Sequence, residues 1–82
     1  LVRSRGLGDV YKDRNKSLQI ANELNYIIGI INAYYNLGRI AFLQQNYIKA
    51  KEYWELSLNK SYAIDYKSGI DFSYNALNQL PK

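Results

Sequence analysis

The sequence repeats itself with a period of 40 residues, and this repeat constrains the possible fold more than any other feature. Residues 24–30 (LNYIIGI) align with residues 64–70 (IDYKSGI). The identities continue on both sides in the same register and without gaps: Ser17-Leu18 aligns with Ser57-Leu58, and Leu37 aligns with Leu77. Self-similarity at a fixed period is typical of proteins that stack one small structural unit. We therefore expect a repeat protein with about two units.

Each unit reads as a pair of helices. Apolar residues recur at three- and four-residue spacing, which indicates helix rather than strand. Asn25, its repeat mate Asp65, and Asn46 are favoured N-cap residues, and Pro81 ends the last helix. We expect four helices, at about residues 10–24, 27–44, 47–63 and 67–80. Because short connections make consecutive helices antiparallel, the predicted fold class is all-α, with helix hairpins stacked as a short α-solenoid.

The beginning of the chain fits the repeat less well. We expect residues 1–8 to be a flexible basic segment and residues 9–82 to be the repeat region. The spacing from Leu7 to Leu18 is 11 residues, whereas the corresponding spacing from Leu37 to Leu58 is 21 residues. Either the first repeat is truncated and Asp9 caps a single helix, which we favour, or two non-contiguous segments are joined. Since no initiator Met is present, we expect the chain to be a piece of a longer protein.

The composition excludes most catalytic and metal-binding chemistry. The chain has 82 residues and contains no Cys, His or Met. Disulfides, zinc sites of thiolate or imidazole, and Ser-His-Asp or Cys-His nucleophiles are therefore excluded. The seven acidic residues are spread along the sequence and do not suggest a carboxylate metal site. We expect no enzymatic activity, no cofactor and no metal.

Charge and hydropathy argue against nucleic acid and membrane partners. The net charge is +4, but residues 6–81 carry eight basic and seven acidic side chains, so most of the excess lies at the chain ends. A nucleic-acid-binding domain would place a basic cluster on one face of a folded element. No segment approaches the roughly 20 apolar residues of a membrane helix. Nucleic acid binding is therefore an unfavoured alternative, and the expected location is the cytoplasm.

The aromatic and small residues of the hairpin at residues 27–63 follow a known pattern. Tyr34, Leu37-Gly38, Ala50, Trp54 and Ser57 stand at spacings that resemble those of a tetratricopeptide repeat. The resemblance covers about residues 15–80. Its 40-residue period is similar to that of Pins-type polarity scaffolds and Rap-type peptide-sensing regulators of bacteria. This chain departs from the family pattern at two positions, Ala41 in place of an aromatic residue and Tyr62 in place of proline.

The resemblance implies a protein- or peptide-binding module, with the ligand on a concave face lined by the first helix of each hairpin. The positions that it assigns to this face are Asn32, Tyr35, Asn36, Arg39, Leu43, Phe72, Asn75 and Gln79. In related repeats an Asn at the position of Asn36 binds the peptide backbone, since an amide offers both donor and acceptor. Arg39 is suited to a carboxylate. Ala76 replaces this Asn in the next unit. The remaining aromatic residues fall mostly on the stripes that must pack, so we expect them in the core.

Two other functions stay open. Stacked repeats bury their apolar faces against neighbours, and about three repeats are usually needed for stability. The outer faces of two units must therefore be covered by further repeats, a partner or a second copy. One alternative is a self-associating repeat scaffold, a homo-oligomer formed through exposed repeat ends. The other is the peptide-sensing part of a larger regulator.

Overall fold

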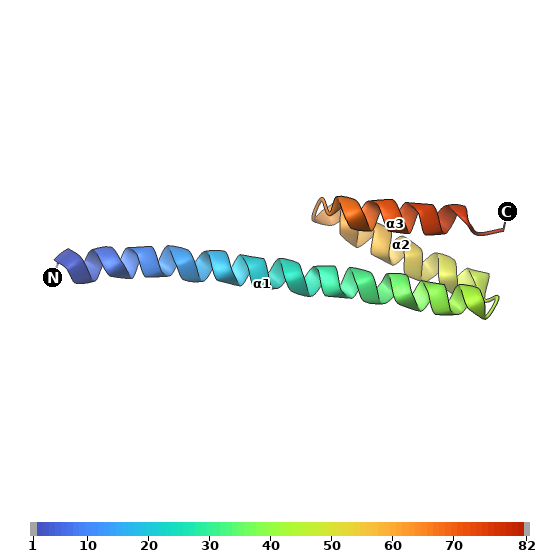
Figure 1. Ribbon diagram of the computed structural model, residues 1–82, viewed down its shortest axis with the longest axis horizontal. Helices are drawn as coiled ribbons and strands as arrows, with labels where there is room; N and C mark the ends of the chain where they lie inside the picture. Colours follow the sequence, from blue (N-terminus) through green and yellow to red (C-terminus); the bar gives the residue numbers. More distant parts are fainter. Residues whose placement is uncertain (1, 82) are drawn as a thin grey trace.

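The chain folds into helices alone over the part that the structure describes. The computed structural model describes residues 2–81, with side chains described for residues 19–81. Within residues 2–81 it contains three helices and no strand: α1 (Val2–Leu43), α2 (Tyr47–Ala63) and α3 (Lys67–Asn78). Helix α2 folds back on the C-terminal part of α1, and α3 lies against α2 (Figure 1). The N-terminal part of α1 projects beyond this body, so the molecule measures 67 × 18 × 13 Å. The all-α prediction is confirmed.

The structure has three helices where the sequence predicted four. The helices expected at residues 10–24 and 27–44 form one continuous helix, and Asn25 lies inside it rather than at an N-cap. Residues 24–26 contain neither Gly nor Pro, so continuing the helix has only a small intrinsic cost. A turn there would need the stabilisation that packing of the preceding segment supplies. Residues 2–8, expected as a separate flexible segment, are also part of α1, and no element boundary falls at residue 9.

The two connections have the same backbone geometry. Gln45 and Asp65 adopt positive φ angles of 62° and 55°. One residue further on, the amide of Asn46 donates to the carbonyl of Ala41 at 2.8 Å, and the amide of Tyr66 donates to that of Ser61 at 2.8 Å. This pattern is the Schellman motif, which satisfies the free carbonyl groups at a helix C-terminus. Helices α1 and α2 therefore end in the same turn, and each is followed by a helix that runs back antiparallel.

The N-cap predictions had different outcomes at the two turns. The Asn46 side chain accepts a hydrogen bond from the amide of Lys49 at 3.3 Å, so the prediction for α2 is confirmed. Asp65 was expected to cap the last helix, but it is the left-handed residue of the turn. Tyr66 takes the N-cap position of α3, and no side-chain hydrogen bond caps this helix. The prediction for Asp65 was wrong because Asp suits both positions, and the local sequence does not distinguish them.

The core is built around the single tryptophan. Trp54 is 1% exposed and packs with the small residues Ala41, Ala50 and Ala76, one from each helix. Its indole nitrogen donates a hydrogen bond to the Tyr35 carbonyl at 3.0 Å. Gly38 and Ala50 are both buried, as expected for a close helix crossing. A Cβ atom added at Gly38 would overlap the indole ring, so α1 can approach Trp54 this closely only through a glycine.

Buried serines join the three helices by hydrogen bonds. Ser57 of α2 donates to the Ile31 carbonyl of α1 at 3.2 Å, and its Oγ lies 2.7 Å from the Oγ of Ser73 in α3. Ser61 donates to the Ser57 carbonyl at 2.8 Å. Among the described residues, every buried side-chain nitrogen and oxygen atom has a partner. Because hydroxyl groups are short, the two bonds of Ser57 to α1 and α3 hold the helix axes close together.

Candidate functional site

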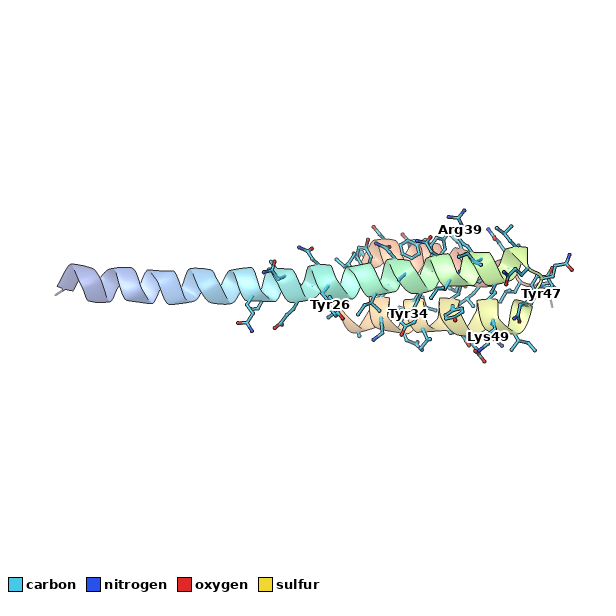
Figure 2. All side chains as sticks on the ribbon, turned by 90° about the horizontal axis from the view of Figure 1, so that it is seen from below. Tyr26, Tyr34, Arg39, Tyr47 and Lys49 are labelled. Carbon is cyan, nitrogen blue, oxygen red and sulfur yellow. The ribbon has the colours of Figure 1, made fainter. Side chains whose placement is uncertain are left out.

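Two aromatic rings join the first helices of successive units. The ring of Tyr35 in α1 and the ring of Phe72 in α3 lie 4.6 Å apart between centroids, tilted by 47°. The ring of Tyr66 also lies near Phe72, with the two centroids 6.4 Å apart in an edge-to-face arrangement. The Arg39 guanidinium carbon lies 6.0 Å from the centre of the Tyr35 ring, which is the range of a weak cation–π contact. Arg39 projects toward the α3 side of α1, whereas Tyr34 lies on the α2 side and stacks on Tyr53 (Figure 2).

Two hollows lie along α1 beside these rings. The first has a volume of about 260 Å³ and includes residues from all three helices; its lining is Tyr35, Arg39, Phe42, Leu43, Trp54, Ala76 and Gln79. We call this hollow the α1–α3 groove. The second has a volume of about 270 Å³ and is lined by Asn36, Arg39, Ile40 and Leu43. Arg39 and Leu43 line both hollows and therefore form the ridge between them. Each volume suits one large side chain of a peptide better than a drug-sized molecule.

The structure brings most of the predicted site residues together. Tyr35, Arg39, Leu43 and Gln79 line the α1–α3 groove, and Asn36 lines the second hollow. Phe72 is half-buried against Tyr35. Asn32 and Asn75 are exposed on α1 and α3, outside the linings of these two hollows.

Three residues of the α1–α3 groove were not expected there, namely Phe42, Trp54 and Ala76. Trp54 and Ala76 also belong to the core, so the groove is floored by the same side chains that hold the helices together. A sequence signal existed for Phe42, because it follows Tyr35 by seven residues and therefore lies on the same side of the helix. No comparable signal existed for Trp54, since its position on α2 says nothing about which surface its ring edge reaches.

Asn36 and its repeat mate Ala76 have different environments in the two units. Asn36 is exposed, whereas its repeat mate Ala76 is 5% exposed and packs in the core beside Trp54. The difference arises because Ala76 packs against Ala50 and Trp54 of α2, whereas no described residue buries Asn36 on α1. The Asn36 amide is therefore accessible to solvent.

Arg39 is the only charged residue among those that line the two hollows. Its side chain is exposed, and its neighbours there are aromatic, aliphatic or amide groups. A guanidinium group binds a carboxylate in a two-pronged hydrogen-bonded pair. The chemistry of the site is thus an apolar floor with amide groups and one positive charge at its rim. This arrangement suits binding of an apolar side chain with a polar or anionic group beside it.

A larger hollow of about 520 Å³ lies elsewhere, between α2 and the C-terminal residues. Its lining includes Lys51 and Glu55 on α2 and Leu77, Leu80 and Pro81 after or within α3. Lys51 and Glu55 are exposed and of opposite charge, and no aromatic ring contributes to this lining. We prefer the α1–α3 groove as the candidate site because it combines enclosure by three helices with aromatic side chains and a cation.

The described residues offer neither a metal-binding cluster nor a membrane span. They contain no cluster of three or more His, Cys, Asp or Glu side chains arranged to hold a metal ion. Over that part of the chain, none of the helices combines the length and the apolar character needed to cross a membrane.

Comparisons with protein-family models, with curated proteins and with solved structures each gave no match. The resemblance to the tetratricopeptide repeats therefore depends on the residues named above and on their spacing.

Proposed function

We propose that this chain is a peptide-binding repeat module of the tetratricopeptide type, with a binding rather than a catalytic role. The observation that carries the proposal is the α1–α3 groove, where Tyr35 and Phe72 meet and Arg39 stands at the rim. This is the surface on which the resemblance expects a ligand. The proposed ligand is a segment of a partner protein, and the proposed location is the cytoplasm.

The proposed architecture is a short α-solenoid in which the C-terminal half of α1 pairs with α2 and α3 begins the next unit. The equal turns at Gln45 and Asp65 support it, because they give each helix the same relation to the one before. A solenoid of this kind places the first helices of its units side by side on one surface. Tyr35 and Phe72 come from two such helices.

The side chains of the groove suggest how a peptide would be held. An apolar side chain of the ligand fills the hollow against Phe42 and Trp54. Asn36 and Gln79 exchange hydrogen bonds with its backbone, and Arg39 pairs with a carboxylate. Because Arg39 is the only charge at the rim, acidic segments are preferred over basic ones.

An array of 12-residue peptides, each in an acidic and an amide form, tests the proposal. Binding is followed by the fluorescence of Trp54, the only tryptophan of the chain. We expect acidic peptides to bind and Arg39→Gln to weaken them about fivefold, the loss of an exposed charge-assisted pair of about 1 kcal/mol. Lys67→Gln, which removes a cation from exposed α3 surface, is the matched control and leaves the affinity unchanged. Equal loss in both variants, or no peptide that changes the fluorescence, would overturn the proposal.

Self-association is a second candidate function, and one specific observation favours it. A face of α1 whose repeat mate is buried lies open to solvent. Its consequences are followed in the next subsection.

A further inference from the structure

One side of α1 carries the same residue pattern as the side of α3 that packs on α2. We call this side the outer face of α1; it comprises Tyr26, Gly29, Ile30, Ala33, Leu37 and Ile40. Forty positions later, the chain has the same residue at four of these six positions and a similar one at the other two, within α3 or close to its ends. Within α3, Gly69 and Ser73 are buried, and a Cβ atom added at Gly69 would overlap the Ser61 side chain of α2. This residue pattern therefore allows another helix to pack closely against it.

The outer face of α1 is open to solvent in the structure. Tyr26 is 72% exposed, Ile40 is 52% exposed and Leu37 is 41% exposed. A Cβ atom added at Gly29 would meet nothing within 4 Å. Tyr26 lies where α1 leaves the body of the molecule (Figure 2). Leaving this much apolar surface in water is unfavourable by about 25 cal/mol per Å², so a helix that covers it gains free energy.

The chain itself contains a segment in register with the helix that covers α3. Residues 7–23 stand 40 positions before α2 (Tyr47–Ala63), and Ser17-Leu18 repeats Ser57-Leu58 within it. By the same register, Ala21 corresponds to Ser61, the residue that contacts Gly69. Residues 7–23 are thus the natural cover for the outer face, with Ala21 against Gly29. Two small residues allow the helix axes to approach closely.

The continuous helix prevents this contact within one molecule. Ala21 and Gly29 are eight residues apart on the same straight helix, a separation of about 12 Å along its axis. The helix therefore carries residues 7–23 away from the outer face of their own chain (Figure 1). Residues 7–23 of one copy can instead cover the outer face of α1 in a second copy.

We propose that two copies of this chain pair through antiparallel α1 helices, with Ala21 of each copy on Gly29 of the other. The contact is symmetric, because both pairs of positions are centred on Asn25, and a two-fold axis there relates the copies. It is therefore a closed dimer rather than an open chain. Helices paired over residues 7–43 overlap along about 55 Å. With a contact width of about 10 Å on each copy, the pairing buries about 1,100 Å², near the lower limit of specific interfaces.

The dimer uses none of the residues that line the α1–α3 groove, and it shares only Ile40 with the second hollow. It covers Gly29 and the neighbouring outer face, whereas the α1–α3 groove opens beside Tyr35, Phe72 and Gln79. Arg39→Gln is therefore expected to leave the dimer intact, and a monomeric variant is expected to retain the groove.

Sedimentation equilibrium of the 82-residue chain gives the first test. We expect a mass of twice 9.6 kDa at micromolar concentration. Gly29→Gln is expected to raise the dimer dissociation constant at least tenfold, because its side chain separates the helices. The monomer keeps its fold, since the new side chain enters open space. Asn59→Gln, at an exposed position of α2, is the control and leaves the constant unchanged. A monomeric wild-type chain, or equal constants for both variants, would overturn the proposal.

Cysteine pairs test the register, and the natural chain supplies no competing thiol. Ala21→Cys with Gly29→Cys is expected to form a covalent dimer under mild oxidation. Glu23→Cys with Gly29→Cys is the control. Residue 23 faces a different side of the helix from residue 21, so the two thiols of this variant are expected to stay reduced. A disulfide within one chain needs the Cα atoms within about 7 Å, which the straight helix forbids. An intramolecular disulfide would show that residues 7–23 fold back in their own chain, and it would overturn the dimer, as would absence of any disulfide.

Discussion

Glycine at position 38 sets how closely α1 and α2 approach. Trp54 fills the space that a side chain would occupy, and it also donates its hydrogen bond to the backbone of α1 at Tyr35. The same ring floors the α1–α3 groove. A single crossing point thus determines both the packing of the hairpin and the depth of the candidate site.

Replacing Gly38 by Ala is expected to destabilise the fold by about 2 kcal/mol, although Ala is the better helix former. The added methyl group overlaps the indole ring, and overpacking of this kind costs about 1–3 kcal/mol. Urea unfolding followed by Trp54 fluorescence measures the change. Asn59→Ala, at an exposed helical position, is the control and is expected to be neutral or slightly stabilising. A Gly38→Ala protein as stable as wild type would contradict the close crossing.

Ser57 is the hydroxyl on which the three-helix contact depends. Ser57→Ala is expected to cost about 1–3 kcal/mol, because the Ile31 carbonyl loses its side-chain donor and the Ser73 hydroxyl loses its partner. Ser57→Ala combined with Ser73→Ala is expected to cost less than the sum of the two single changes. A double-mutant cycle of unfolding free energies measures this coupling. Strict additivity would show that the two hydroxyl groups do not interact.

At the scale of elements, identical turns follow α1 and α2, and each requires a residue with positive φ. Gln45 and Asp65 hold these positions at a cost that Gly would not incur. Their hydrogen bonds nevertheless match one another within the two turns. The turn geometry is therefore imposed by the packing of the helices rather than by an ideal turn residue.

Gln45→Gly is expected to stabilise the protein by up to about 1 kcal/mol, since Gly adopts positive φ without steric cost. Gln44→Gly, one residue earlier and without a positive φ, is expected to destabilise by about 0.5–1 kcal/mol. Thermal unfolding followed by circular dichroism compares the two variants. Changes of the same sign in both would show that the left-handed conformation is not what distinguishes position 45.

The sequence predicts two of the three junctions correctly, and the third shows why local sequence is insufficient. The segments at 24–26 (LNY) and 64–66 (IDY) are alike, yet the first is helix and the second is a turn. The turn at 64–66 is stabilised because α2 and α3 pack on each other through Gly69 and Ser61. At 24–26 no such contact is made among the residues whose side chains the structure describes, and the helix continues. Spacing alone indicates which residues of the site share a helix side, but not that Trp54 reaches the groove from α2.

At the scale of the whole molecule, the projecting part of α1 makes the protein much longer than a compact chain of its size. The Cα radius of gyration is 18.8 Å, whereas a compact domain of 82 residues has about 12 Å. The body formed by α2, α3 and the C-terminal half of α1 accounts for only part of the length (Figure 1).

Small-angle X-ray scattering distinguishes the straight helix from a folded-back one. For the Gly29→Gln variant at a dilution where it is monomeric, we expect a radius of gyration close to the 18.8 Å of the straight form. The largest dimension is expected near the 67 Å length of the molecule. A radius near 12 Å would instead indicate that residues 7–23 pack on the body. Asn59→Gln, measured at the same dilution, controls for the effect of an added side chain.

The continuity of α1 has a mechanical consequence. Its 42 residues form one rigid helix of about 63 Å, and Tyr35 and Arg39 belong to the same helix as its first turns. A helix resists bending and twisting, so rotation applied at one end reappears at the other. A molecule that binds the first turns of α1 therefore also determines the orientation of the candidate groove.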